Sequence, residues 1–142
     1  APQDDVAGIL RLIEPFEQDG TLVKRSRTEI ERDIGNYSIV EHDGVLFACA
    51  ALYPYPEAKT GEMAALTVSS QSQGQGDGEK VLKRIEQRAR EAGLQSIFVL
   101  TTRTMHWFIK RGFQPMDPEW LPEARKRKYN WDRKSQVLVK KL

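Results

Sequence analysis

The fold is decided by the stretch Val68-Ser-Ser-Gln-Ser-Gln73-Gly-Gln-Gly76-Asp-Gly78-Glu-Lys-Val-Leu82. An apolar run ends at Val68 and gives way to small or polar residues and three alternating glycines. An amphipathic helix follows at once, and its apolar positions recur at helical spacing: Val81, Leu82, Ile85 and Ala89. Glycines let successive backbone amides turn inward, and the first N–H groups of a helix lack intrahelical partners. The stretch therefore predicts a nest for an anion such as a pyrophosphate.

Two other phosphate-binding loops fit this stretch poorly. A Walker loop ends in Gly-Lys-Ser or Gly-Lys-Thr, whereas Gly78 is followed by Glu79 and Lys80. A dinucleotide fingerprint needs an acidic residue about 20 residues further on, at the end of the next strand. The apolar run Ile97-Phe-Val-Leu100 ends in two threonines instead.

The remaining pattern, Gln/Arg-x-x-Gly-x-Gly/Ala, resembles the pyrophosphate loop of the GCN5-related N-acetyltransferases (GNAT), which bind acetyl-CoA. It fits in two registers, 71–76 and 73–78, and the second is preferred because the family places a Val five residues before the Gln. The resemblance implies that the cofactor loop consists of Gln73, Gly74, Gln75, Gly76, Asp77, Gly78 and Glu79. A second segment, Trp107-Phe108-Ile-Lys-Arg-Gly112-Phe113, resembles the family segment that flanks the CoA thiol and implies a contact from Phe108.

The composition is that of a soluble globular domain. The chain has 142 residues, 39% hydrophobic and 30% charged, which fits one domain of about 100–200 residues. No apolar run approaches the roughly 20 residues that cross a bilayer, and no signal peptide is expected. The single cysteine, Cys49, lies in an apolar strand pattern and is expected in the core, which fits a reducing cytoplasm. A homo-oligomer stays open.

Positive charge gathers near the C-terminus. Residues 123–142 carry eight Lys or Arg and two acids, so the first 122 residues have a net charge of −4 within a total of +2. A solvated face, a nucleic-acid patch and a pocket for carboxylates all remain possible for this segment. Tyr129 and Trp131 interleave with the charges, but the total charge is too small for a footprint along a duplex.

Helical and strand patterns alternate along the chain without repeats or linkers. Asp4 is predicted to cap the first helix, which carries apolar residues from Val6 to Phe16, and Ser26 with Glu29 predicts a capping box. The expected helices are 27–34, 78–92 and 105–111, and the expected strands are 37–41, 45–53, 62–68, 97–101, from 113, and 136–140. This α/β order, a mixed sheet flanked by helices, is that of the GNAT fold without its opening strand, which would precede Ala1.

Further segments resemble one branch of this family, the acetyltransferase domains of bacterial N-acetylglutamate synthases. The most specific are Leu100-Thr-Thr-Arg103 and Tyr129-Asn-x-x-Arg133-Lys-Ser135. The resemblance implies that residues 1–142 form one GNAT domain of a longer chain with an upstream amino-acid-kinase-like domain. It also implies an enzyme, an amino-acid N-acetyltransferase that moves the acetyl group of acetyl-CoA to the α-amine of L-glutamate, the first step of arginine biosynthesis.

The same resemblance implies the catalytic groups. Glu62 takes the role of the base that removes a proton from the substrate ammonium, although the sequence alone would make it a solvated strand-edge residue. The backbone of Ala65, Leu66, Thr67 and Val68 is expected to pair with the pantetheine arm of acetyl-CoA. Many family members use a Tyr before Gly112 as the acid for the departing thiolate; this chain has Phe108, so Thr101 is the candidate. No metal is expected.

Substrate selection requires cations, because L-glutamate brings two carboxylates. The candidates are Arg25, Arg125 and Arg133, with Ser135 and Lys24 in support; each arginine taken alone could equally be a surface charge. Two other functions stay open: an acetyltransferase for a different amine, such as a polyamine or a protein lysine, and a non-catalytic module that binds acetyl-CoA or nucleic acid. The basic, acid-poor segment after residue 122 argues against a polyamine site, and neither nucleic acid nor a membrane is the expected partner.

Overall fold

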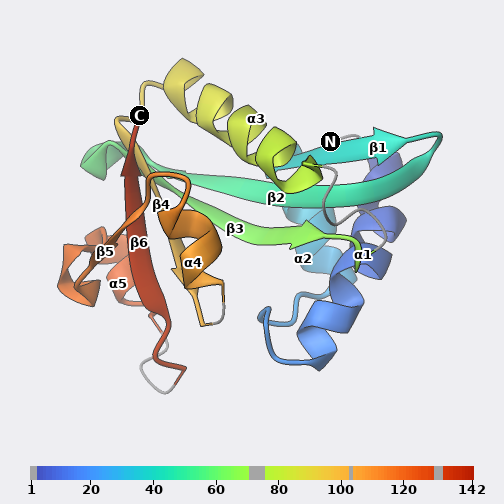
Figure 1. Cartoon of the computed structure of the whole chain (residues 1–142), viewed down its shortest axis with the longest axis horizontal. Helices are drawn as coiled ribbons and strands as arrows, with labels where there is room; N and C mark the ends of the chain where they lie inside the picture. The colour runs from blue at the N-terminus through green and yellow to red at the C-terminus, as the bar shows by residue number, and fades with distance from the viewer. Residues whose placement is uncertain (1–2, 71–75, 103, 130–132) are drawn as a thin grey trace.

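A computed structural model describes residues 3–70, 76–102, 104–129 and 133–142 of the chain (Figure 1). In this part of the chain, six strands form one sheet in the order β1-β2-β3-β4-β6-β5. The strands are β1 (Tyr37–His42), β2 (Val45–Tyr55), β3 (Thr60–Val68), β4 (Ser96–Thr101), β5 (Gln114–Met116) and β6 (Gln136–Lys141). The α-helices are α1 (Val6–Gln18), α2 (Arg27–Asp33), α3 (Asp77–Glu91), α4 (Met105–Ile109) and α5 (Glu123–Lys126). Short 3-10 helices are η1 (Gln3–Asp5), η2 (Ile34–Asn36), η3 (Pro56–Ala58) and η5 (Pro118–Trp120).

Most local predictions hold. The β1–β2 hairpin turns at Asp43 and Gly44, both with positive φ, and this is the backbone that matches the twist of two paired strands. The capping box is present, since Ser26 accepts from the Glu29 amide while the Glu29 side chain accepts from the Ser26 amide. The predicted cap at Asp4 is wrong. A 3-10 turn precedes α1, so its N-cap is Asp5, whose side chain makes no capping hydrogen bond.

The sheet has a hydrophobic core on each face, because successive side chains of a strand point to opposite sides. On β2, Ala48, Ala50 and Leu52 pack in the cluster that contains the buried side of α3. Cys49 and Ala51 alternate with them and pack against α1 and α2. Figure 1 shows α3 along one side of the sheet and α1 with α2 on the other, while β4, β5 and β6 with α4 and α5 form the remaining end.

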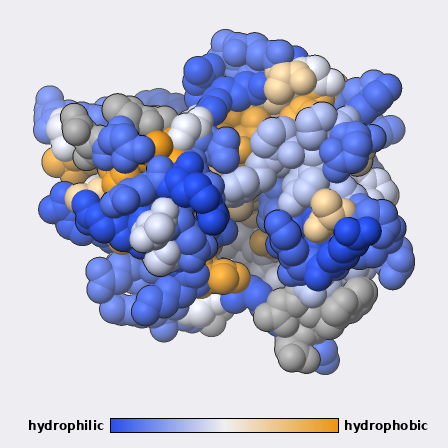
Figure 2. Space-filling model, turned by 180° about the vertical axis from the view of Figure 1, so that it is seen from behind, coloured by the Kyte–Doolittle hydropathy of each residue, from blue (hydrophilic) through white to orange (hydrophobic). Residues whose placement is uncertain are grey.

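The face seen in Figure 2 is largely hydrophilic, and hydrophobic residues show in limited areas of it. The large hydrophobic side chains that are exposed are scattered over separate elements: Val23, Val45, Ile109 and Met116. No helix within the described ranges is long and apolar enough to span a bilayer.

Arg88 links α3 to the start of β1 through hydrogen bonds. Its guanidinium donates to the carbonyls of Gly35, Asn36 and Tyr37 and to the hydroxyl of Ser38, at 2.6–3.2 Å. These carbonyls lie where the 3-10 turn after α2 leaves backbone acceptors without helical partners.

Arg88→Met is therefore expected to lower the free energy of unfolding by about 1.5–3 kcal/mol, because charge-assisted bonds are lost and backbone acceptors stay partly buried. Urea denaturation measures this loss. Arg84→Met, an exposed charge on the same helix, is the matched control and should change stability by less than about 0.5 kcal/mol. Equal losses in the two variants would contradict the assigned role of Arg88.

Candidate active site between diverging strands

The main cavity opens where β3 and β4 separate. These parallel strands pair only from Thr60–Glu62 with Ser96–Phe98. Beyond that point β4 stays paired with β6 as far as Thr101, whereas β3 continues alongside β2, and Figure 1 shows the two strands diverging. The cavity has a volume of about 890 Å³ and is lined from both strands, from the start of α3 and from the segments near α2 and α5.

A β-bulge shapes the β3 wall. Two residues of β3, Ala65 and Leu66, stand opposite one residue of β2, and Ala65 has a positive φ of 57°. The Thr67 hydroxyl holds this conformation by donating to the Ala65 carbonyl at 3.0 Å. Bulges near active sites redirect a strand. Here the described pairing with β4 ends before the bulge, so the edge of β3 from 65 to 68 is open to an extended ligand.

The glycine-rich stretch meets the cavity at the start of α3. Gly76 is the N-cap with φ of 78°, and the first helical bond runs from the Lys80 amide to the Gly76 carbonyl at 3.1 Å. The amides of residues 77–79 therefore lack intrahelical acceptors and lie on the cavity wall. A Cβ at Gly78 would lie 3.1 Å from both Trp107 and Val68, so a side chain at this position would crowd these two residues at the cavity wall. Gln73, Gly74 and Gln75 lie outside the described residues.

We expect Gly76→Val to weaken CoA binding roughly 10-fold, because a β-branched residue disfavours positive φ by more than 1 kcal/mol and tilts the amides that follow. Calorimetric titration with CoA measures the effect. The fold should persist, since among the described residues, apart from the chain neighbours, no atom lies within 4 Å of the added Cβ. Gly35→Val, at a glycine with equal space and no positive φ, is the control; unchanged CoA binding by the Gly76 variant would exclude this loop as the anion nest.

The predicted base and one predicted substrate arginine are partners in the structure. Glu62 Oε1 accepts from Arg125 Nε at 2.6 Å, and Glu62 Oε2 accepts from Arg125 Nη2 at 3.4 Å. Both side chains line the cavity and are mostly buried, 11% and 18% exposed. A carboxylate offers about four lone-pair positions, so Glu62 keeps acceptor capacity for an amine proton while Arg125 holds it in place. Arg125, predicted as a substrate residue, thus has Glu62 as its partner in the structure, and its role toward the substrate stays a prediction.

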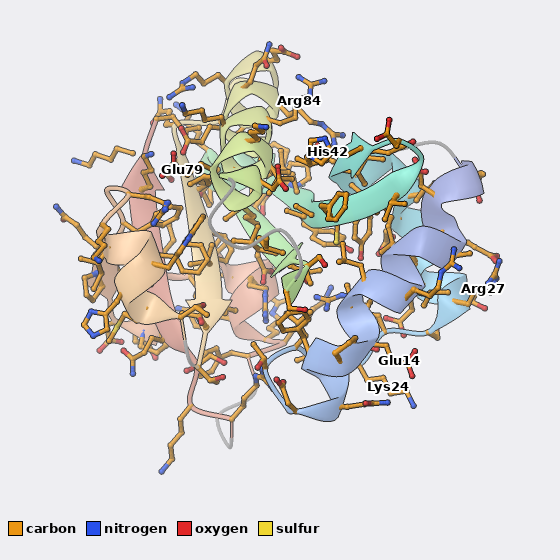
Figure 3. The ribbon with its side chains drawn as sticks, turned by 45° about the vertical axis from the view of Figure 1, so that its right-hand side comes forward. Glu14, Lys24, Arg27, His42, Glu79 and Arg84 are labelled. Atoms are coloured by element: carbon orange, nitrogen blue, oxygen red, sulfur yellow. The ribbon has the colours of Figure 1, made fainter. Side chains whose placement is uncertain are left out.

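The other predicted substrate residues divide between cavity and surface. Arg25, Arg133 and Ser135 line the cavity. Arg133 Nη2 donates to the Thr21 carbonyl at 2.7 Å, which joins the C-terminal wall to the segment that carries Arg25. The structure does not bring Lys24 into this cavity. Its side chain is exposed, and Figure 3 shows it at the outer surface beside α1, because the segment turns the neighbouring Arg25 inward instead.

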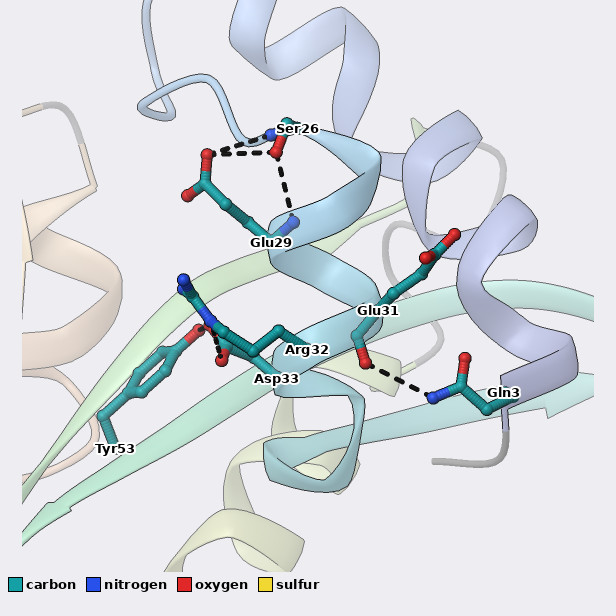
Figure 4. Close-up of polar contacts among 7 residues, drawn as sticks. All are labelled: Gln3, Ser26, Glu29, Glu31, Arg32, Asp33 and Tyr53. Atoms are coloured by element: carbon teal, nitrogen blue, oxygen red, sulfur yellow. Dashed lines mark hydrogen bonds and ion pairs between the residues drawn. The ribbon is translucent and has the colours of Figure 1, made fainter.

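A polar cluster on the α2 side of the cavity was not predicted from the sequence (Figure 4). Tyr53 donates to Asp33 Oδ2 at 2.9 Å, and Arg32 donates to both Asp33 oxygens at 2.9 and 3.1 Å. The hydrogen bond from Arg32 holds the pKa of Asp33 below its ordinary value, while burial raises the pKa of Tyr53. The register of β2 and β3 places Tyr53 directly opposite Glu62, but no sequence pattern indicated its contact with Asp33.

The β4 wall carries the candidate acid. Thr101 is buried, lines the cavity, and its oxygen lies 2.8 Å from the Thr104 hydroxyl and accepts from the Thr104 amide at 3.1 Å. Phe108 also lines the cavity but packs edge-on against Phe113, so it offers an apolar surface. Thr101 and Thr104 thus both present hydroxyls on this wall, and the role of Thr101 as the acid stays a prediction.

Cys49 takes no part in this chemistry. Burial raises the pKa of its thiol to about 12, and the thiol donates to the Ala65 carbonyl at 3.6 Å. A protonated, fully buried thiol is neither a nucleophile nor a metal ligand, which confirms its prediction as a core residue. In the described ranges, no group of three or more His, Cys, Asp or Glu side chains is arranged to hold a metal ion.

The glycine-capped start of α3 and the β3 edge from 65 to 68 lie where the GNAT resemblance predicts contacts with acetyl-CoA. The chain belongs to the acetyltransferase (GNAT) family, whose model matches residues 6–113. This membership confirms the predicted fold, a mixed six-stranded sheet flanked by helices.

Within this family, the chain is similar to named amino-acid acetyltransferases. The amino-acid acetyltransferase of Ralstonia nicotianae is 61% identical over 142 residues, which cover 100% of this chain and 32% of that protein. The structure of N-acetylglutamate synthase from Neisseria gonorrhoeae with coenzyme A and N-acetyl-glutamate superposes with a TM-score of 0.93 at 45% identity, over 97% of this chain and 33% of that one. The chain therefore spans about a third of the length of the curated relatives it matches.

Proposed function

We propose that this chain transfers the acetyl group of acetyl-CoA to the α-amine of L-glutamate, giving N-acetyl-L-glutamate and CoA. One observation carries the proposal: a single cavity joins the glycine-capped start of α3 to the Glu62–Arg125 pair. The first end suits a pyrophosphate and the second an amino acid. The similarity to amino-acid acetyltransferases over the whole chain supports the same assignment.

The residues present fit acetyl-CoA as a co-substrate. The glycine-capped start of α3, with the positive end of its helix dipole, suits the pyrophosphate; the edge of β3 suits the amide-bearing pantetheine arm; and the gap between β3 and β4 leads toward Glu62. Acetyl-CoA supplies an activated acyl group, a thioester whose carbonyl carbon accepts an amine.

The base and the hydrogen-bond donor to the leaving group are side chains on opposite walls of the cavity. Glu62 takes a proton from the substrate ammonium, the neutral amine then forms the C–N bond as the C–S bond breaks, and the second amine proton ends on the departing thiolate, which leaves as the CoA thiol. Backbone amides near the bulge at Ala65 polarise the carbonyl oxygen where charge develops. Thr101 donates a hydrogen bond toward the departing sulfur from the opposite wall.

The charges at the amino-acid end favour a dicarboxylate. Among the described lining residues away from α3, the cations are Arg25, Arg32, Arg125, Lys128 and Arg133, and the carboxylates are Glu29, Asp33 and Glu62. This excess of two positive charges favours a substrate with a net negative charge, such as glutamate, over a cationic amine. Arginine also offers the planar donor pair that binds a carboxylate with two bonds.

The same contacts weigh against the alternatives. A polyamine needs free carboxylates, whereas Asp33 and Glu62 are each paired with an arginine. A nucleic-acid patch needs outward cations, whereas Arg125 turns into the cavity and Lys126 pairs with two nearby glutamates. We assign the reaction to the first step of arginine biosynthesis and place it in the cytoplasm.

A substrate panel tests the proposal. kcat/KM for acetylation is compared for L-glutamate, L-glutamine, L-aspartate and spermine under identical conditions. L-Glutamate should exceed L-glutamine by at least about 10-fold, because the amide leaves a cation without its charged partner. A preference for spermine, or RNA binding without any acetylation, would overturn the proposal.

A further inference from the structure

The helix end that is proposed to receive the pyrophosphate carries two carboxylates of its own. Asp77 and Glu79 lie in the first turn of α3, and both line the cavity. Acidic residues stabilise a helix start through its dipole, but they repel an anionic ligand bound at the same place. A site for CoA at this end therefore requires that these two charges be compensated.

Each carboxylate has a cation from another part of the fold or the next turn. Arg111, after α4, donates to Glu79 at 3.0 Å. Asp77 is fully buried and lies 3.3 Å from His42 Nε2 and 3.7 Å from Lys80 Nζ. Figure 3 shows Glu79 on one side of α3 and His42, a neighbour of Asp77, on the other, so the two carboxylates have separate partners.

Arg111 is held firmly in its position. Its guanidinium stacks 3.8 Å over the Trp107 ring, and Nη1 donates to the Trp107 carbonyl at 2.9 Å. The side chain is 24% exposed, and its Nε is buried without a hydrogen-bond partner in the described part of the chain. The same Trp107 ring lies against Gly78, where an added Cβ would be 3.1 Å away. Arg111 thus contacts the cofactor end of α3 through both charge and packing.

We infer that Arg111 is a positioning residue for CoA: it neutralises Glu79 so that the start of α3 accepts the pyrophosphate. The inference rests on the CoA site of the proposed function and not on the identity of the amine. It adds to that site the side chain of Arg111, which belongs neither to the glycine-rich loop before α3 nor to the edge of β3.

The test is a double-mutant cycle read by calorimetric titration with CoA. Arg111→Met keeps an unbranched stem on Trp107 but removes the charge, and should weaken CoA binding about 3- to 5-fold, the range for one partly exposed charge. Glu79→Gln should bind CoA at least as tightly as the wild type. The combined variant should regain wild-type affinity, because the carboxylate that required compensation is gone. KM for L-glutamate should not change in any of them.

Lys83→Met is the matched control, because Lys83 is an exposed charge on α3 that lines the same small surface pocket as Glu79 and Arg111. It should leave CoA binding unchanged. If the combined variant binds as weakly as Arg111→Met, the role is packing alone and the inference fails. Absence of CoA binding by the wild type would overturn the proposed function itself, whereas CoA binding with a different amine substrate leaves the inference standing.

Discussion

Glu62→Gln is expected to lower kcat about 10²–10⁴-fold at neutral pH, the usual contribution of one general base. The amide has nearly the same shape and can still accept a bond from Arg125, but it cannot take a proton from the substrate ammonium. The loss should shrink as the pH rises, because more of the substrate amine is already neutral. Steady-state kinetics across neutral and alkaline pH, with saturating acetyl-CoA, measure both effects.

Arg125→Met is the companion variant. This variant disturbs the Glu62–Arg125 pair but keeps the base, so it should raise KM for L-glutamate more than it lowers kcat. CoA binding should stay unchanged in both variants, since the glycine-capped end of α3 is formed by other residues. Wild-type turnover by Glu62→Gln at neutral pH would show that Glu62 is not the base.

Arg133→Ala should lower kcat/KM for L-glutamate about 10- to 150-fold, which corresponds to the roughly 1.5–3 kcal/mol of one charge-assisted contact. The side chain lines the cavity, and its bond to the Thr21 carbonyl fixes its direction. Arg133→Lys should restore only part of the activity, because an ammonium lacks the planar pair of donors. Acetyl-CoA affinity should remain constant.

Lys134→Ala removes a neighbouring charge that is exposed, so it serves as the matched control and should leave the kinetics unchanged. A nucleic-acid patch predicts a different pattern. Both variants would then lower RNA affinity and reduce its salt dependence, and neither would alter acetylation. That pattern would contradict the assignment of Arg133 to the substrate.

The fold was accessible from the sequence because its signals are local. The continuous apolar run on β2, the helical spacing on α3 and the turn at Asp43–Gly44 each specify one element within a few residues. The exceptions are also local: the 3-10 turn before α1 shifts its start beyond Asp4, and the one-turn helix α5 is too short to show a period.

The site was only partly accessible, because its decisive contacts join distant residues. Glu62 and Arg125 are 63 positions apart, and Arg133 and Thr21 are 112 apart. Most side chains that the resemblance indicated line the cavity, but the resemblance did not indicate their hydrogen-bond partners. It also indicated Lys24, whose exposed side chain does not line the cavity, whereas its neighbour Arg25 does. The Tyr53–Asp33 bond depends on the packing of α2 against β2, which no local pattern encodes. The roles of all these residues stay predictions until they are tested.

The most direct measurement is the identity of the product formed from acetyl-CoA with a ¹³C-labelled acetyl group and L-glutamate. NMR follows the labelled acetyl carbon while a thiol assay follows CoA release. The predicted result is one N-acetyl-L-glutamate for each CoA released, with the label in an amide. CoA release accompanied only by labelled acetate, or no release while CoA still binds, would contradict acetyl transfer to glutamate in this cavity.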